Sequence, residues 1–267
     1  MKRIADYRFD QSLGSGNHGE FFLAKPPKRL GLDVDRVAVK VLGLNATDDA
    51  FRRVANELQL FSSIDCEQLV TLYDVGQQSG IFFYAMEYFP LGSLAKPTQS
   101  PTRPQILAAM ADIARAAHAL HEAGVAHRDI KPANVMLTDR GARLSDLGLA
   151  QILTPGQTVT GIGPIGTIEY MEPAVVLGER AGRASDIWSI ATTLHRALTG
   201  ESVYGVLPDG DLVTMLRHVV QTQPSLSSDL SDEEADLLRT CLAADRTERP
   251  ASAADVATRL DELVVKV

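Results

Sequence analysis

Two kinds of hydrophobic pattern follow each other along the chain, and the change between them divides it in two. In the first third, short runs rich in branched and aromatic residues are separated by Gly, Pro or Asp, which is typical of strands joined by turns. Residues 50–64 instead carry apolar side chains at a three-to-four spacing, which predicts one amphipathic helix. The strands are predicted at residues 7–13, 20–24, 37–42, 70–75 and 81–88.

The rest of the chain is predicted to be mostly helical. Residues 90–104 are rich in Gly, Ser, Thr and Pro, which is typical of a connector. We therefore place a boundary near residue 90, between a smaller lobe of strands with one helix and a larger helical lobe. Periodic, partly Ala-rich segments predict helices at residues 105–123, 184–199, 211–221, 232–243 and 252–264.

Composition narrows the classes of protein to which the chain can belong. Its 267 residues, 45% hydrophobic and 22% charged, can bury a substantial core in one or two domains. A formal charge of −8, from 26 basic and 34 acidic residues, argues against nucleic acid as a partner. Cys66 and Cys241 lie far apart, which indicates neither a disulfide scaffold nor a zinc site and favours a cytoplasmic location. No signal peptide and no run of about 18 apolar residues is visible, so we expect no membrane span in this chain.

The densest polar pattern lies near the middle of the chain. A carboxylate on a short loop can orient a hydroxyl group and accept its proton. An amide oxygen and a second carboxylate can hold Mg²⁺ against nucleotide phosphates. The pattern therefore favours phosphoryl transfer. It consists of His127-Arg128-Asp129, Lys131, Asn134 and Asp146-Leu147-Gly148.

A glycine-rich run, Gly14-Ser15-Gly16-Asn17-His18-Gly19, lies between two predicted strands. Glycines allow the backbone to approach phosphate oxygens closely. A strand on each side argues against the strand-to-helix turn of dinucleotide-binding proteins. Taken alone, the run is equally compatible with a glycine-loosened hairpin. The following Val37-Ala38-Val39-Lys40 favours nucleotide binding, because it places a lysine in an otherwise apolar strand.

These motifs together resemble the protein kinase family, from about residue 7 to residue 263. The resemblance implies an α+β, bilobal protein-kinase-like fold over residues 1–267, with a small antiparallel β-sheet lobe at about 1–89 and a mostly helical lobe at about 90–267. It implies a eukaryotic-like (Hanks-type) serine/threonine protein kinase, bacterial by its Ala-rich composition, that uses ATP with Mg²⁺ or Mn²⁺. Protein substrates with Ser or Thr acceptors are expected. Two alternatives stay open, namely a pseudokinase scaffold and a kinase that acts on a small molecule.

The resemblance also assigns roles in the central motif. Asp129 is implied as the catalytic base or hydroxyl-positioning carboxylate, and Lys131 as the group that stabilises the transferring phosphoryl group. Asn134 and Asp146 are implied as ligands of the metal ions.

In the smaller lobe, the resemblance implies that Lys40 contacts the nucleotide phosphates and is held by Glu57. The adenine is expected to lie between Ala38 and Met136, although Met136 is equally compatible with core packing. The other positions implied in ATP binding are Leu13, Gly14, Ser15, Gly16, Asn17, His18, Gly19, Phe21, Met86, Glu87 and Phe89.

Residues 149–171 are expected to form the activation segment. Thr158 and Thr160 are candidate phosphosites, because a phosphothreonine there can pair with Arg128. Hydroxyl residues are also common in loops without any such role. A homodimer would allow this autophosphorylation in trans. Thr167, together with the lysine of the central motif, favours serine or threonine as the acceptor.

Three positions depart from the family's pattern. Phe21 stands where valine is usual, and its ring is expected to narrow the nucleotide pocket or to stack on the base. Leu147 replaces the usual phenylalanine. Ala174, in Glu172-Pro173-Ala174, occupies the position of a glutamate that normally pairs with the arginine matched here by Arg249. Because an unpaired buried charge is costly, we expect this arginine to be exposed or to find another carboxylate, with Glu172 as the candidate.

Overall fold

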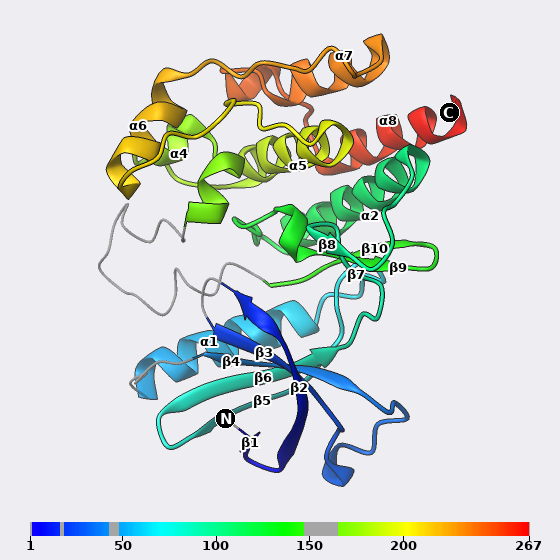
Figure 1. Ribbon diagram of the computed structural model, residues 1–267, viewed down its shortest axis with the longest axis vertical. Coiled ribbons are helices and arrows are strands. Elements are labelled where there is room, and N and C mark those ends of the chain that lie inside the picture. Colours follow the sequence, from blue (N-terminus) through cyan, green and yellow to red (C-terminus); the bar gives the residue numbers. More distant parts are fainter. Residues whose placement is uncertain (1, 17–18, 43–47, 147–164, 267) are drawn as a thin grey trace. The chain divides into compact units, whose positions relative to one another are not determined.

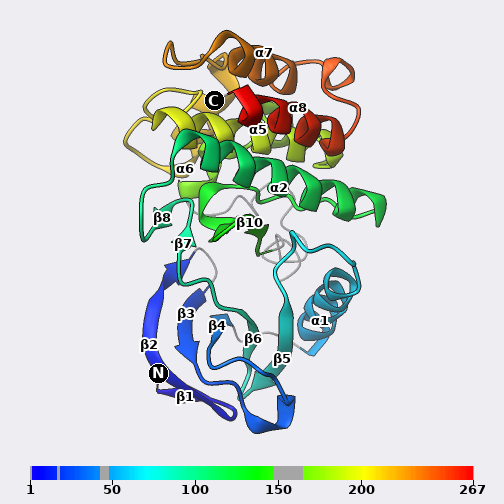
Figure 2. The same ribbon diagram turned by 90° about the vertical axis from the view of Figure 1, so that its right-hand side faces the viewer.

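A computed structural model describes residues 2–16, 19–42, 48–146 and 165–266. The described residues form two compact units, shown in Figures 1 and 2. The first contains the described residues of the ranges 2–65 and 70–90, and the second contains residues 66–69, 91–146 and 165–266.

The first unit is built on a six-stranded antiparallel sheet, which confirms the strand-rich character predicted for this part of the chain. One helix, α1 (Asp48–Ser62), contacts β5 (Figure 2). A 3₁₀ turn, η1 (Lys28–Leu30), lies between β3 and β4. In spatial order the strands are β1 (Arg3–Ile4), β2 (Tyr7–Gly16), β3 (Gly19–Ala24), β4 (Val37–Leu42), β6 (Ile81–Glu87) and β5 (Leu72–Gln78).

The two faces of this sheet carry different kinds of side chain. Residues directly opposite each other in an antiparallel pair share a face, and successive residues of a strand alternate between faces. The row Phe22, Val39 and Ala85 lies on the face of the hydrophobic core. The adjacent row, Phe21, Lys40 and Tyr84, therefore lies on the opposite face. The buried core contains Ile4, Tyr7, Phe22, Ala24, Val37, Val39, Val41, Phe83 and Ala85.

The second unit is mostly helical, as predicted. Its central helix, α2 (Arg103–Glu122), contacts α5 (Arg183–Thr199), α8 (Ala253–Lys266) and strand β10. Buried alanines of α2 allow these neighbours to approach closely, since their side chains are small. No helix in the described part of the chain has both the length and the hydropathy that a bilayer span requires. The remaining α-helices among the described residues of this unit are α4 (Pro173–Val176), α6 (Leu212–Gln221) and α7 (Asp232–Cys241).

A small four-stranded sheet in this unit was not predicted. Its order is β10 (Gly141–Leu144), β9 (Val135–Thr138), β7 (Gly92–Ser93) and β8 (Lys96–Pro97). The last two strands fall in the segment expected to be a connector. Each is only two residues long, and β7 joins β9 through the single pair Ser93 and Met136, so tertiary contact rather than local pattern creates them. The part of the unit that the structure describes also contains the 3₁₀ helices η2 (Pro132–Asn134), η3 (Ile165–Tyr170) and η4 (Arg246–Glu248).

Candidate functional site

Two polar side chains of the second unit, those of Lys131 and Asn134, contact the carboxylate of Asp129. The ammonium of Lys131 lies 2.8 Å from both carboxylate oxygens of Asp129 and also donates to Thr167 Oγ1 at 2.8 Å. Asn134 Nδ2 donates to the backbone oxygen of Asp129 at 2.7 Å and to its Oδ2 at 3.0 Å. Three of the residues predicted to carry chemistry are thus in direct contact, on the loop that leads into η2.

The orientation of the Asn134 amide follows from its partners. Both groups that its Nδ2 contacts can only accept a hydrogen bond, so the nitrogen must face them. The amide oxygen is then the atom that can ligate a cation. In the described residues, no three His, Cys, Asp or Glu side chains form a metal-binding group.

Ser145 ties the segment around Asp146 to this cluster. Its backbone nitrogen and its hydroxyl donate to the backbone oxygen of Asn134, at 2.9 and 3.1 Å. Its own backbone oxygen lies 3.0 Å from His127 Nε2. The following residue, Asp146, has a left-handed backbone with φ of 56°, a conformation that aspartate tolerates better than most residues. Sequence reasoning did not single out Ser145; its position directly before Asp146, a candidate metal ligand, was the signal that could have found it.

Asp186, at the start of α5, holds the backbone of the loop that carries Asp129. Its Oδ1 accepts from the backbone nitrogen of Arg128 at 2.8 Å. Its Oδ2 accepts from the backbone nitrogen of His127 at 2.8 Å and lies 2.8 Å from His121 Nε2. Arg128 has φ of 66°, which costs on the order of 1 kcal/mol or more for a residue with a Cβ. The fully buried carboxylate compensates for this strain by satisfying both backbone groups.

His127 is a fixed, neutral part of the same loop. Burial lowers its pKa from the ordinary value, and this outweighs the opposing charges of Asp186 and Asp129. Its Nδ1 accepts from the backbone nitrogen of Asp129 at 3.3 Å, so the proton resides on Nε2, which faces the backbone oxygen of Ser145. The ring thereby joins the two chain segments that carry Asp129 and Asp146.

In the first unit, the residues predicted to bind the nucleotide share one face of the sheet. Lys40 on β4 pairs with Phe21 on β3 and with Tyr84 on β6. Two residues along the strand, Ala38 pairs with Met86 and therefore lies on the same face. All of them except Phe21 are buried, including Lys40, which is 7% exposed. Glu57 lies on α1, but its side chain is outside the described part, so its pairing with the lysine stays a prediction.

The glycine-rich run forms the facing ends of β2 and β3. Gly16 pairs with Gly19, while Asn17 and His18 lie outside the described residues. At Gly19 only glycine fits, because φ is 152° and a Cβ would lie 2.2 Å from the backbone oxygen of Val41. Gly14 also has positive φ, 123°, and three of the positions predicted to bind ATP are exposed on β2, namely Leu13, Gly14 and Ser15.

The remaining predicted positions are divided among three parts of the chain. Glu87 ends β6 and donates its backbone N–H to the backbone oxygen of Thr71 at 2.9 Å. Phe89 is buried shortly after it. Met136 lies on β9 in the second unit. Leu147 and the candidate phosphosites Thr158 and Thr160 lie outside the described residues.

Comparison with known proteins identifies the family. The model of the protein kinase domain family matches residues 7–259. This chain belongs to the protein kinase family. Serine/threonine-protein kinase PknJ of Mycobacterium tuberculosis is 31% identical over 95% of the kinase chain, and serine/threonine-protein kinase PrkC of Bacillus subtilis is 30% identical over 84% of it. The chain covers only 44% of PknJ and 35% of PrkC, so it spans less than half the length of these relatives. It is a Hanks-type kinase of the bacterial group.

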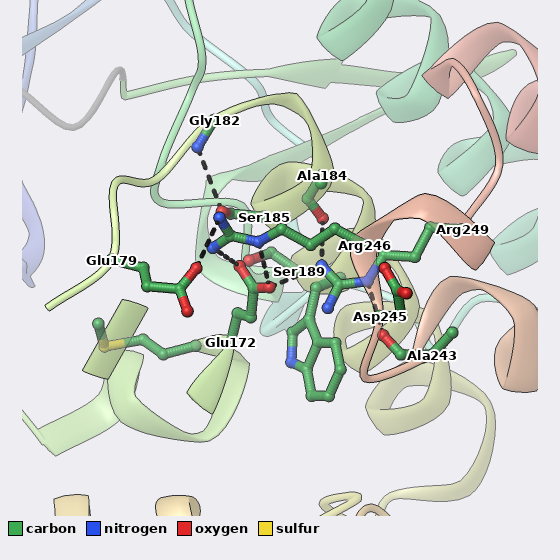
Figure 3. A network of polar contacts seen from close by, with 12 residues as sticks. Glu172, Glu179, Gly182, Ala184, Ser185, Ser189, Ala243, Asp245, Arg246 and Arg249 are labelled. Atoms are coloured by element: carbon green, nitrogen blue, oxygen red, sulfur yellow. Dashed lines mark hydrogen bonds and ion pairs between the residues drawn. The ribbon is translucent and has the colours of Figure 1, made fainter. Parts of the chain in front are cut away.

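The kinase chain departs from its family at Glu172, and the structure shows how (Figure 3). Glu172 Oε1 lies 2.8 Å from Arg249 Nη1, and both side chains are 1% exposed. Arg246 also binds Glu172 through two bonds of 2.7 Å, Nε to Oε1 and Nη2 to Oε2. The expectation that Arg249 finds another carboxylate in place of one at position 174 is therefore confirmed. The second arginine was not predicted, because nothing in its local sequence distinguishes it from a surface charge.

Further contacts hold the side chains of Glu172, Arg246 and Arg249 in place. The guanidinium of Arg249 lies 4.9 Å from the ring centroid of Trp188. The indole N–H of Trp188 donates to the hydroxyl of Tyr204 at 3.1 Å, and that hydroxyl donates to the backbone oxygen of Met171 at 2.7 Å. Met171 and Glu172, which lie just before α4, are thus anchored to the segment between α5 and α6 and to the segment before α8.

Proposed function

We propose that this chain transfers the γ-phosphate of ATP to serine or threonine hydroxyls of proteins. The observation that carries the proposal is the contact of Asp129 with Lys131 and Asn134, and of Lys131 with Thr167, at 2.7 to 3.0 Å. A carboxylate held from two sides can orient an incoming hydroxyl group and accept its proton. The ammonium beside it can stabilise charge on the transferring phosphoryl group.

The residues also fit a magnesium nucleotide. Asn134 and Asp146 would hold Mg²⁺, or Mn²⁺, through oxygen atoms. The ion, when bound, offsets negative charge on the phosphate oxygens. Lys40 would contact the phosphates, with Glu57 holding the lysine.

The nucleotide itself would contact backbone and apolar groups. Glycine-rich backbone would approach its phosphates, and the apolar face around Ala38 and Met86 would accept the adenine. Backbone groups of Glu87 and Phe89 would form its hydrogen bonds. The remaining positions assigned to this contact are Leu13, Gly14, Ser15, Gly16, Asn17, His18, Gly19, Phe21 and Met136.

We also propose that the chain phosphorylates itself at Thr158 or Thr160. Arg128 supports this, because its exposed side chain lies next to Asp129 in the sequence and could pair with a phosphothreonine. A homodimer would allow the reaction between two copies. We further assign residues 1–267 to one kinase domain, with lobes at about 1–89 and 90–267.

The test is phosphate transfer by the wild type and by Asp129→Asn. Each protein is incubated with Mg²⁺ and radiolabelled ATP, with and without unstructured proteins rich in serine and threonine, and then subjected to intact-mass and phosphosite analysis. The wild type is expected to label serine or threonine, and loss of the general base should lower turnover by about 10²- to 10⁴-fold. Asp139→Asn, at an exposed position between β9 and β10, is the matched control and should retain full activity.

The outcomes separate the proposal from its rivals. Equal rates for the wild type and Asp129→Asn would overturn the catalytic assignment. Nucleotide binding by the wild type without any transfer would indicate a pseudokinase scaffold. Rapid labelling of a sugar or an aminoglycoside with no labelling of protein would indicate a small-molecule kinase.

A further inference from the structure

The ammonium of Lys40 has two aromatic neighbours within its own sheet. Its Nζ lies 4.8 Å from the ring centroid of Phe21 and 5.8 Å from that of Tyr84. The two rings belong to the strands on either side of β4, directly opposite the lysine in the register. Both distances fall within the range in which a cation is attracted to the face of a ring.

The ring of Phe21 can stabilise the buried ammonium of Lys40. Lys40 is 7% exposed, and burial of an ammonium is costly unless another group replaces its water. A carboxylate does so by neutralising the charge. A ring stabilises the ammonium through its quadrupole without removing its charge, so the ring of Phe21 can act beside the carboxylate of Glu57 that is proposed to hold the lysine.

We propose that Phe21 is a positioning residue that orients the ammonium of Lys40 toward nucleotide phosphates, an inference that rests on the function proposed above. The ring occupies one side of the ammonium and keeps water from it, so that its N–H groups are directed to other acceptors. Tyr84 has the longer distance and is the secondary neighbour. Valine, which the family usually has at the position of Phe21, has no ring face and cannot make this contact.

The test replaces Phe21 with phenylalanines that carry one, two, three and five ring fluorines. Each added fluorine withdraws electron density from the face of the ring while almost preserving the shape of the side chain. Binding of ADP and of a non-hydrolysable ATP analogue with Mg²⁺ is measured by calorimetry. We expect affinity to fall with each step, by about 3- to 30-fold over the whole series. Phe21→Tyr should retain affinity, and Phe21→Leu should lose about as much as the most fluorinated ring.

The same series at Phe22 is the matched control. Phe22 neighbours Phe21 on β3 but lies on the opposite face, stacked on Phe9 with centroids 4.1 Å apart. Its fluorination can change thermal stability but should leave nucleotide affinity unchanged. A flat or rising trend at Phe21, with normal binding by the wild type, would overturn the inference alone. Failure of the wild type to bind any nucleotide would overturn the proposed function and this inference with it.

Discussion

Glu172 and Arg249 form an ion pair of 2.8 Å in which each side chain is 1% exposed. The carboxylate lies two residues earlier in the sequence than in the usual family pattern, at the residue that precedes α4. The change from Ala-Pro-Glu to Glu-Pro-Ala is therefore an exchange of positions that preserves a buried acidic partner for the arginine.

Replacing Glu172 by Gln should destabilise the fold strongly. The variant keeps the shape of the side chain but leaves Arg249 buried without a countercharge, and breaking a buried pair in this way costs about 3 to 5 kcal/mol. The free energy of unfolding, measured with urea at neutral pH, should fall by about that amount.

Glu179→Gln is the control for that measurement. Glu179 also pairs with Arg246, at 3.1 Å, but its side chain is 60% exposed. A pair of this kind contributes at most about 1 kcal/mol. Equal losses for the two variants would contradict a special role for the buried carboxylate.

The stability difference between the wild type and Glu172→Gln should depend on pH. Burial raises the pKa of Glu172, but the hydrogen bonds from Arg246 and Ser185 and the charge of Arg249 lower it by more, so it lies below its ordinary value of 4.5. The charged form therefore stabilises the fold fully above about pH 4.5, and this contribution is lost as the pH falls through the lower folded-state pKa.

Urea unfolding of both proteins at several pH values between 7 and 3 checks this prediction. The difference in unfolding free energy should be constant from pH 7 to about pH 5 and should then shrink. A difference that grows on acidification would have the wrong sign for a carboxylate whose pKa is lowered.

Asp186→Asn should affect both stability and phosphate transfer. The amide has one acceptor oxygen where the carboxylate has two, so at least one of the backbone N–H groups of His127 and Arg128 loses its acceptor. We expect the free energy of unfolding to fall by about 2 to 4 kcal/mol. The rate of transfer should also fall, because the left-handed backbone of Arg128 then loses support beside Asp129.

Asp236→Asn provides the comparison for Asp186. Its carboxylate pairs with Arg259 at 2.7 Å but is 65% exposed. The loss should stay below about 1 kcal/mol, with transfer unchanged. Full activity and stability of Asp186→Asn would show that its hydrogen bonds to the loop are dispensable.

Two buried histidines should be neutral and should carry their protons on different nitrogens. His127 has its proton on Nε2, whereas His195 donates from Nδ1 to the backbone oxygen of Glu201 and accepts at Nε2 from the backbone nitrogen of Ser227. Nitrogen-15 correlation spectra of the histidine rings distinguish these two forms. The same protonated nitrogen in both rings would contradict the hydrogen bonding seen here.

The same histidines predict how acid weakens the fold. Burial lowers the pKa of both rings below the ordinary value of 6.5. Below about pH 6.5 the unfolded chain therefore binds more protons than the folded chain. The stabilisation from the neutral rings is complete above about pH 6.5 and is lost as the pH falls below it. In a titration followed by nitrogen-15 spectra, both rings should gain their second proton with midpoints below the ordinary pKa of 6.5.

The local hydrophobic pattern was sufficient to predict the long helices and strands of both units. Helices such as α2 and α5, and strands such as β4, follow from periodicity that a single segment displays by itself. Their ends shifted by only a few residues, since caps and fraying decide the last turn. The two-residue strands β7 and β8 could not be predicted, because their pairing depends on partners distant in the sequence.

For the candidate site, the sequence by itself determined which groups are present and in which order: a lysine in an apolar strand, and Asp129, Lys131, Asn134 and Asp146 around a short loop. Only the tertiary structure decided what each group touches. It placed Phe21 opposite Lys40, inserted Ser145 between Asn134 and His127, and gave Arg249 the carboxylate of Glu172. The physical reason is that periodicity records the environment of one segment, whereas a hydrogen bond or ion pair requires two segments to reach the same few ångströms of space.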